Sequence, residues 1–408
     1  MAVASFIILS YICTVINRRT MFRTKFLLTL LLLSALVQPA VGRIVTGDER
    51  TSLYLPLLEG RRVALFSNHT GLARNKHVLD ILTEKGVDVA CIFSPEHGFR
   101  GTADAGEGVN SSVDEKTGVP ILSLYGKESP LKSAETLDLF DVLVVDIQDV
   151  GLRFYTYYVT MCHLMDACAT KGKAVIVLDR PNPNGHYVDG PILDMTLRSG
   201  VGWLPIPVVH GMTLGELAQM INGEGWLEDG RTCELTVIPC KHYTHKAKVP
   251  VTTPPSPNLP NRQAVLLYPS LCLFEATPVS VGRGTDLPFQ IYGHPDLKTL
   301  PYRFKPESRP GAKNPPQLGK YCYGRDLSHM SEKEIERGGF SLSYVIEAYR
   351  MLDMGDSFFT SFFENLIGRR DIRQMIEQGK SAEEIKATWQ DDVRNFKEQR
   401  RKYLLYKE

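Results

Sequence analysis

One carboxylic acid, Glu96, lies between a proline and a His-Gly pair in the segment Ser94-Pro95-Glu96-His97-Gly98. This segment follows the apolar run 87–93, so Glu96 would be held where a buried strand ends. A partly desolvated carboxyl group has a raised pKa and can donate a proton near neutral pH. A helix cap or a loop ion pair is the simpler explanation for an isolated glutamate. Its position and neighbours nevertheless favour Glu96 as a general acid, and His97 could tune or share the proton transfer.

Polar side chains also follow three other apolar runs of strand length. Because the carboxyl ends of parallel strands share one edge, where open α/β sheets bind ligands, four such clusters predict a site. Arginine presents a fork of donors that matches a carboxylate, and tyrosine rings can stack against a sugar. Alternatively, the tyrosines open a helix and the Pro-Asn turns only reverse the chain. The candidates for substrate binding in these clusters are Asn68, His69, Gln148, Arg153, Tyr155, Tyr157, Asp179, Arg180 and Asn182.

Two later segments add further candidates. Glu275 follows a short apolar run and could be a second catalytic carboxylate, with Asp149 as its rival, although a buried structural hydrogen bond would explain Glu275 equally well. The turn Gly282-Arg283-Gly284-Thr285-Asp286 lacks the spacing of a nucleotide-binding loop. Its Arg283 and Thr285 are plausible substrate contacts.

Composition and missing motifs exclude several classes of protein. The 47 basic and 46 acidic residues give a net charge of +1 and form no basic stripe, which argues against nucleic-acid binding. The sequence lacks the HExxH motif that would predict a catalytic zinc, and it lacks the GxSxG motif of a nucleophile elbow. A nucleotide-dependent enzyme has little support without the glycine fingerprint after the first strand. We expect neither a metal nor a cofactor.

Short apolar runs alternate with helical stretches between residues 61 and 179. Continuous apolar strands separated by helices predict a parallel sheet that is covered on both faces, which is an α/β fold. The predicted strands are 62–66, 87–93, 141–146 and 174–178, and the predicted helices are 77–85 and 158–171.

The proline-rich stretch 249–260 predicts a boundary between residues 43–250 and a second domain, 251–408. Residues 306–317 read as an exposed loop. The last ~70 residues have helical periodicity, with an apolar face that includes Phe358, Phe359, Phe362 and Phe363. Cys233 and Cys240 could pair in an oxidising compartment.

The first 42 residues have the pattern of a targeting segment. Apolar runs at 6–16 and 26–37 flank a basic stretch, and small residues follow the second run, as in a secretory signal. Translation from Met21 would give this signal its usual length. An uncleaved anchor is the rival, but the second run is shorter than the ~20 residues that a spanning helix needs. We expect a periplasmic or secreted protein without a stable membrane span after cleavage.

Six motifs occur in this order along the chain: SNHTG (67–71), SPEHGFRG (94–101), DIQDVGLRFYTY (146–157), LDRPNP (178–183), SPNLP (256–260) and GRGT (282–285). Together they resemble the NamZ-type exo-β-N-acetylmuramidases, and the resemblance covers residues 45–408. It implies a Rossmann-like parallel-sheet N-terminal domain, a smaller α+β C-terminal domain and a site in the cleft between them. It also implies that the protein acts on peptidoglycan-derived sugars or muropeptides, releasing N-acetylmuramic acid from the non-reducing end, with Glu96 in the family's catalytic motif.

Glycoside hydrolysis needs a proton donor and a second group that assists attack at the anomeric carbon. Glu96 suits the first role, and Asp149 and Glu275 compete for the second. Muramic acid carries a lactyl carboxylate, which Arg153, Arg180 or Arg283 could bind. The alternative to an enzyme is a non-catalytic glycan-binding protein of the cell envelope that uses the same cleft.

Overall fold

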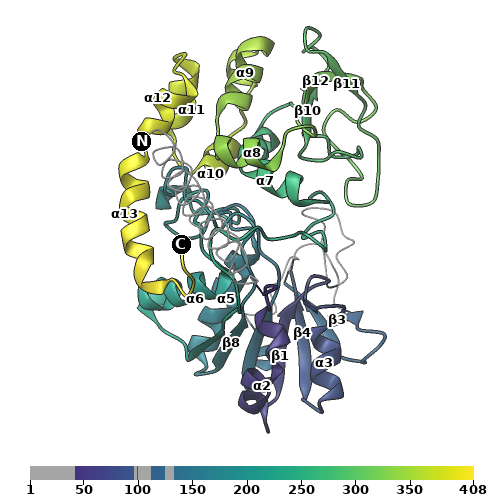
Figure 1. The fold of residues 1–408 in the computed structure, drawn as a ribbon, viewed down its shortest axis with the longest axis vertical. Coiled ribbons are helices and arrows are strands. Elements are labelled where there is room, and N and C mark those ends of the chain that lie inside the picture. The colour runs from purple at the N-terminus through teal and green to yellow at the C-terminus, as the bar shows by residue number, and fades with distance from the viewer. Residues whose placement is uncertain (1–41, 96–98, 100–111, 125–132) are drawn as a thin grey trace, which may run out of the picture. The chain divides into compact units, whose positions relative to one another are not determined.

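The computed structural model describes residues 42–95, 99, 112–124 and 133–408 (Figure 1). Ile44–Glu408 form one compact unit around a seven-stranded sheet with the order β5-β6-β4-β1-β7-β8-β9. Neighbouring strands are parallel except for β5 and β6, which confirms the predicted α/β class. The strands are β1 Val63–Ser67, β4 Val89–Ser94, β5 Ser112–Val113, β6 Pro120–Ser123, β7 Val142–Asp146, β8 Ala174–Leu178 and β9 Leu235–Ile238.

Side chains of the central strands alternate between two hydrophobic clusters, one on each face of the sheet. Leu65 of β1 lies in the cluster that contains residues of α3 (Val78–Glu84). Its neighbour Phe66 lies in the cluster that contains residues of α5 (Tyr157–Thr170) and α6 (Leu214–Gly223). Burial on both faces explains why these strands read as continuous apolar runs.

The helices connect the parallel strands in the manner of a doubly wound fold. α3 joins β1 to β4, α5 joins β7 to β8, and α6 joins β8 to β9. Strand β1 lies at the centre, because the chain adds β4 and β6 on one side of it and then β7, β8 and β9 on the other. Loops that leave β1 and β7 therefore diverge at the carboxyl edge, where ligands bind in such folds.

The predicted polar clusters follow β4, β1, β7 and β8, which are four consecutive strands of the sheet. The predicted strands and helices agree with the structure to within two residues at each end. Strands β6 and β9 were not expected from the sequence, because each is a four-residue segment with only partial burial. A two-stranded hairpin of β2 (Leu72–Ala73) and β3 (Lys76–His77) follows β1.

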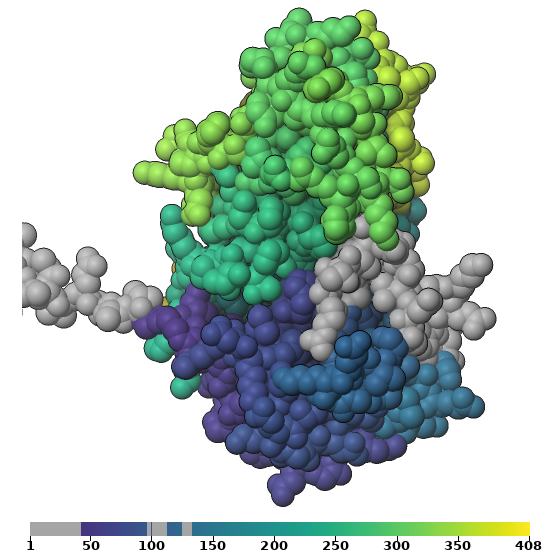
Figure 2. All heavy atoms as spheres, turned by 90° about the vertical axis from the view of Figure 1, so that its right-hand side faces the viewer, coloured from purple at the N-terminus to yellow at the C-terminus, as the bar shows by residue number. Residues whose placement is uncertain are grey.

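The C-terminal part combines helices with a small antiparallel sheet, β10-β12-β11. Figure 2 shows its green residues above the purple and blue residues of the early strands. Helix α13 runs toward α6, which contacts η8 (Figure 1). The elements are α7 Arg262–Leu271, η6 Cys272–Ala276, β10 Ile291–His294, β11 Tyr302–Phe304, β12 Cys322–Asp326, α8 Glu332–Gly338, α9 Ser343–Leu352, η7 Gly355–Ser357, α10 Phe362–Ile367, α11 Asp371–Glu377, α12 Ala382–Ala387, α13 Gln390–Arg400 and η8 Arg401–Tyr403.

Short helical turns complete the first half of the unit. The segment 306–317 contains no helix or strand, as expected. Among the described residues, no helix has both the length and the hydropathy required to cross a bilayer. The remaining helices are η1 Gly47–Glu49, α2 Thr51–Tyr54, η2 Leu55–Leu58, α4 Ala134–Asp138, η4 Met195–Leu197 and η5 Glu228–Gly230.

Two expectations about individual side chains need correction. Cys233 and Cys240 are both buried and free, as are the other five described cysteines, so they do not pair. Phe362 is not part of the buried apolar face, because it is 39% exposed while Phe358, Phe359 and Phe363 are buried. Its ring instead lines a pocket.

Candidate active site

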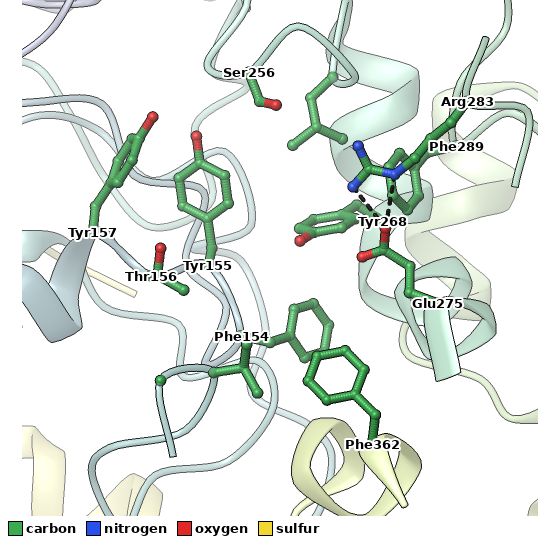
Figure 3. Close-up of a pocket in the computed structure, with 13 residues that line it drawn as sticks. Phe154, Tyr155, Thr156, Tyr157, Ser256, Tyr268, Glu275, Arg283, Phe289 and Phe362 are labelled. Atoms are coloured by element: carbon green, nitrogen blue, oxygen red, sulfur yellow. Dashed lines mark hydrogen bonds and ion pairs between the residues drawn. The ribbon is translucent and has the colours of Figure 1, made fainter. Parts of the chain in front are cut away.

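A pocket of about 410 Å³ lies between the loop after β7 and residues of the C-terminal part (Figure 3). Its volume is within the range of small-molecule sites. The wall from the N-terminal part comes from residues 154–157, at the start of α5, and from Gly200 and Val201. The other lining residues are Ser256, Leu259, Tyr268, Glu275, Arg283, Phe289 and Phe362.

Glu275 and Arg283 form an ion pair on one wall. Nε and Nη2 of Arg283 lie 2.7 and 2.6 Å from the same carboxylate oxygen, Oε1 of Glu275. Within the described part of the chain, the second oxygen, Oε2, accepts only a long contact of 3.4 Å from the Cys272 thiol. The guanidinium lies near the ring of Phe289, 5.0 Å from its centroid. Oε2 therefore keeps most of its capacity to accept a further hydrogen bond.

Tyr155 and Tyr157 lie on the opposite wall, across the pocket from Glu275 (Figure 3). Their hydroxyl groups donate to the carbonyl oxygen of Pro255 at 2.8 and 3.3 Å. Asn68 Nδ2 donates to the Tyr157 hydroxyl at 2.9 Å, so the residue after β1 positions this ring. Burial holds the pKa of the Tyr155 hydroxyl well above its usual range, and the group stays a neutral donor.

The proline-rich segment closes over this edge of the sheet. A ring nitrogen of His69, Nε2, lies 2.8 Å from the Pro254 carbonyl oxygen. Together with the two bonds to Pro255, this contact ties residues 254–255 to the loops after β1 and β7. Asn68 and His69 thus support the pocket wall, and neither lines the pocket.

Aromatic rings that were not expected as site residues cover the rest of the pocket. Tyr268 packs edge to face against both Phe154 and Phe289, at centroid separations of 5.4 and 4.8 Å. With Phe362 they form an apolar surface of the kind that receives the C–H face of a sugar. Tyr268 lies on α7, where the sequence indicated only an apolar segment, so its type and spacing carried no distinguishing signal.

Asp149 is 7% exposed and does not line the pocket. Its Oδ1 accepts the backbone N–H of Gly151 at 2.6 Å, whereas Oδ2 is buried and has no hydrogen-bond partner among the residues that the structure describes. Burial raises the pKa of Asp149 to about 7, against which the Gly151 bond acts only partly. Of the two rival carboxylates, Glu275 alone reaches the pocket.

Arg180 is held between two acids of the sheet interior. Its Nε lies 2.6 Å from Asp146 Oδ1, and its Nη2 lies 2.6 Å from Asp48 Oδ2, with all three groups buried. Burial also raises the pKa of Asp146 to about 7, which the attraction of Arg180 opposes. This guanidinium links η1 to the end of β7 and has a structural position rather than the expected substrate contact.

Arg153 likewise lies outside the pocket. It is fully buried, and its Nη1 donates to the carbonyl oxygens of Pro191 and Ile206 at 2.6 and 3.0 Å. Its Nη2 donates to the carbonyl oxygen of Leu366 at 3.0 Å. The expected substrate contact is therefore replaced by a tie between the loop after β7 and α10.

The acid after β8 caps a helix. Asp179 Oδ1 accepts the backbone N–H of Gly215 at 2.8 Å, and Oδ2 accepts the hydroxyls of Thr213 and Tyr406 at 2.7 and 2.5 Å. These bonds lie at the start of α6 and at the C-terminal tail. Burial raises the pKa of Asp179 to about 6. No part of this carboxylate lines the pocket.

Asn182 connects the loop that follows β7 with the loop that follows β8. Its Nδ2 donates to the Met212 carbonyl oxygen at 2.9 Å, and its Oδ1 accepts the N–H of Asn184 at 2.8 Å. Gly151, with φ of 78°, packs so closely that a Cβ there would lie 2.2 Å from Asn182 Nδ2. Asn182 is a structural residue of the edge and not a pocket residue.

Gln148 and Thr285 are also engaged internally. Gln148 Nε2 donates to the carbonyl oxygens of Asp149 and Pro181 at 2.7 and 2.9 Å. The Thr285 hydroxyl donates to the Gly282 carbonyl oxygen at 2.6 Å and shapes the turn that presents Arg283. Neither residue lines the pocket.

Glu96 and His97 lie outside the described residues. The structure describes the chain up to Pro95, directly after β4, and β4 pairs with β1 in parallel. The Ser94 hydroxyl is buried, and none of the described residues forms a hydrogen bond with it. Among the described residues, no group of three His, Cys, Asp or Glu side chains could hold a metal ion.

Comparison with known proteins adds relatives that cover nearly the whole unit. A family model described as exo-beta-N-acetylmuramidase NamZ, N-terminal, matches residues 63–263, and its C-terminal counterpart matches residues 266–406. The chain is 38% identical over 385 residues to the peptidoglycan beta-N-acetylmuramidase NamZ of Bacillus subtilis (strain 168), covering 89% of this chain and 92% of that protein.

Two crystal structures of DUF1343 family proteins from Bacteroides fragilis NCTC 9343 are similar to this chain. One is 58% identical with a TM-score of 0.85, and the other is 31% identical with a TM-score of 0.73. Each match covers 90% of this chain and 100% of the other. The similarity therefore extends through both the large sheet and the helical C-terminal part.

Proposed function

Because the chain belongs to the exo-β-N-acetylmuramidase NamZ family, we infer that it is an exo-acting glycoside hydrolase that releases N-acetylmuramic acid from the non-reducing end of peptidoglycan fragments. The relative that it matches over 92% of that protein's length is a peptidoglycan β-N-acetylmuramidase. A non-catalytic glycan-binding protein is therefore not favoured.

The observation that carries the proposed site is the carboxylate and guanidinium pair, Glu275 and Arg283, facing tyrosines in a pocket of about 410 Å³. Arg283 is the one arginine of the three candidates that lines this pocket. We assign it to the lactyl carboxylate, which distinguishes muramic acid from glucosamine. The surrounding aromatic rings would receive the apolar face of the sugar.

We assign Glu96 as the proton donor to the leaving oxygen and Glu275 as the group that assists attack at the anomeric carbon. The donor follows β4, which neighbours β1 at the carboxyl edge. Glu275 is favoured over Asp149 because it lines the pocket and because its Oε2 retains acceptor capacity. His97, next to the donor, remains our candidate for tuning the proton transfer.

Replacement of Glu96 by Gln tests the donor. The variant should hydrolyse a chromogenic N-acetylmuramide at least about 100-fold more slowly, since general acid catalysis contributes on that order. Binding of free N-acetylmuramic acid should be retained, because the amide has nearly the shape of the acid. Glu59→Gln, an exposed exchange in the segment that leads into β1, is the matched control. Full activity of the Glu96→Gln variant would refute the assignment.

We propose that residues 1–42 direct export and that the mature protein is periplasmic or secreted. The support is the basic stretch, the apolar run 26–37 and the small residues that follow it. Mass spectrometry of the protein from the periplasm or medium should find an N-terminus near Gly42. A full-length product that remains in the cytoplasm would contradict this.

A further inference from the structure

A second cavity, which we call the tryptophan cleft, is lined by α5, η5 and the loop before Trp203. Its volume is about 540 Å³, and its lining includes His163, Asp166, Arg198, Trp203, Trp226 and Glu228. The chain has three tryptophans, and two of them line this cleft. The third, Trp389, is buried, and its indole N–H donates to Asp189 at 3.0 Å.

The two cleft tryptophans are arranged differently. The guanidinium carbon of Arg198 lies 3.5 Å from the ring centroid of Trp203, and the ring of His163 meets Trp203 edge to face at 4.4 Å. Trp203 is thus held rigidly by a cation and an imidazole. Trp226 is only half-buried, and no hydrogen bond from its indole N–H is found among the described residues. Trp226 packs partly against the hydrophobic core, and the rest of its ring is accessible where it lines the cleft.

Polar groups surround the indoles. The Glu228 side chain is 73% exposed, and its backbone N–H donates to Asp166 Oδ1 at 2.9 Å, which fixes the rim of the cleft. Indole faces receive the C–H face of a pyranose ring, and carboxylates accept from sugar hydroxyls, while arginine donates to an acetamide oxygen. The lining thus matches an N-acetylhexosamine chain.

The cleft and the catalytic pocket lie on either side of one short turn. Ser199 and Gly202 pair through an antiparallel bridge, and between them Gly200 and Val201 line the pocket. The flanking residues Arg198 and Trp203 line the cleft. Val201 of the pocket and Trp203 of the cleft are two residues apart in the chain, so their Cα atoms lie within about 8 Å of each other, a separation comparable to the length of a disaccharide.

We propose that the tryptophan cleft is an accessory saccharide-binding site that holds the glycan chain whose non-reducing end occupies the catalytic pocket. The proposal rests on the proposed function, since it takes the same polymer as ligand. The cleft would then bind the part of a long glycan that extends beyond the sugar in the pocket.

The test compares substrates of two lengths. Trp226→Ala should raise KM about tenfold on peptide-free glycan strands, the effect of truncating one well-packed aromatic contact. It should leave kcat/KM on a chromogenic monosaccharide muramide unchanged, because that substrate fills only the pocket. Tyr321→Ala, which removes an aromatic ring that is 53% exposed elsewhere, is the matched control.

Tryptophan emission gives a direct readout on the wild-type chain. Titration with peptide-free glycan oligomers should change the emission in a saturable manner, and Trp226→Phe should reduce that change. Trp203, which also lines the cleft, supplies the remaining change, and buried Trp389 contributes a constant background. Glu228→Ala, at the exposed rim, replaces Trp226→Ala if the latter fails to fold.

Two results would overturn the proposal. The first is a KM on long glycan strands that is the same in Trp226→Ala, or in Glu228→Ala if that variant replaces it, as in the control Tyr321→Ala. The second is a wild-type tryptophan emission that changes with stem peptides but not with glycan oligomers. A wild-type chain that does not cleave the small muramide would instead refute the proposed function, so the two failures are distinguishable.

Discussion

At the scale of single residues, three arginines that look alike in the sequence differ in what surrounds them. Arg153 donates hydrogen bonds to backbone carbonyl oxygens, Arg180 forms ion pairs with two buried aspartates, and Arg283 lines the pocket. Arg153 and Arg180 are buried and donate to internal acceptors, so they cannot change partners cheaply, because each abandoned buried acceptor costs about 1–3 kcal/mol. Arg283 donates through Nε and Nη2 to Glu275 but lines the pocket, so of the three arginines it is the one placed where an external carboxylate could meet it.

Arg283→Lys should reduce the preference of the pocket for N-acetylmuramic acid over N-acetylglucosamine. A point-like ammonium cannot form the bidentate pair, and loss of a charged hydrogen bond costs about 1.5–3 kcal/mol, or about 10- to 100-fold in affinity. The measurement is the ratio of inhibition constants of the two free sugars. Arg309→Lys, at an exposed arginine paired with Asp286, is the control. An unchanged ratio in Arg283→Lys would exclude the assignment.

The buried carboxyl of Asp149 should make the protein less stable as the pH rises. Its pKa is raised from 3.8 to about 7, so the folded state binds more protons than the unfolded state within that window. The contribution of the Asp149 carboxyl to the free energy of unfolding is fully present below pH 4 and is lost as the pH approaches 7. A shift of this size corresponds to a few kcal/mol, about 1.4 kcal/mol for each unit.

Asp149→Asn should remove this dependence while the acceptor for Gly151 N–H remains. Relative to wild type, the variant should gain about 2–4 kcal/mol in the free energy of unfolding on going from pH 5 to pH 8. Urea denaturation at the two pH values measures this difference. Asp146 and Asp179 titrate in both proteins, so their contributions to the pH dependence cancel in the comparison. The variant Asp88→Asn, at an exposed aspartate, is the control for removing a carboxylate. Equal slopes in variant and wild type would contradict the prediction.

At the scale of elements, the C-terminal residues 404–408, which we call the clasp, form hydrogen bonds with α6 and with residues that follow β8 and β9. Backbone N–H groups of Leu405 and Tyr406 donate to Glu216 Oε1 at 2.8 and 3.3 Å. The Tyr406 hydroxyl donates to Asp179 and accepts from the N–H of Cys240 at 2.8 Å. Two buried carboxylates near the sheet therefore depend on the last residues of the chain.

Tyr406→Phe should lower the free energy of unfolding by about 1–3 kcal/mol, since it leaves Asp179 and Cys240 N–H short of a partner. Truncation after Tyr403 should cost more, about 3–5 kcal/mol, because Oε1 of Glu216 also loses the backbone donors of Leu405 and Tyr406. Chemical denaturation followed by circular dichroism measures both. Tyr321→Phe, at an exposed tyrosine, should change stability little. A truncated chain as stable as the full one would show that the clasp is dispensable.

At the scale of the whole molecule, distant parts of the chain meet around one edge of the sheet. Arg180 and Asp48 are 132 residues apart in sequence, and Arg153 and the Leu366 carbonyl are 213 apart. Residues 254–255 bind both Tyr155 and His69. This interdependence is why Ile44–Glu408 pack as one compact unit, although two family models divide the chain near residue 264.

The sequence by itself determined the parallel sheet, the strands that end in polar clusters, the family and the candidate donor Glu96. Buried runs and turn residues report the conformation of their own segment, so local patterns suffice for these features. Only the tertiary structure decided that Arg283 and Glu275 face the pocket, that Arg153, Arg180, Asp179 and Asn182 are structural, and that Tyr268 and Phe362 join the lining. A polar side chain's role depends on which partners folding brings within hydrogen-bond distance, and those partners lie far away along the chain.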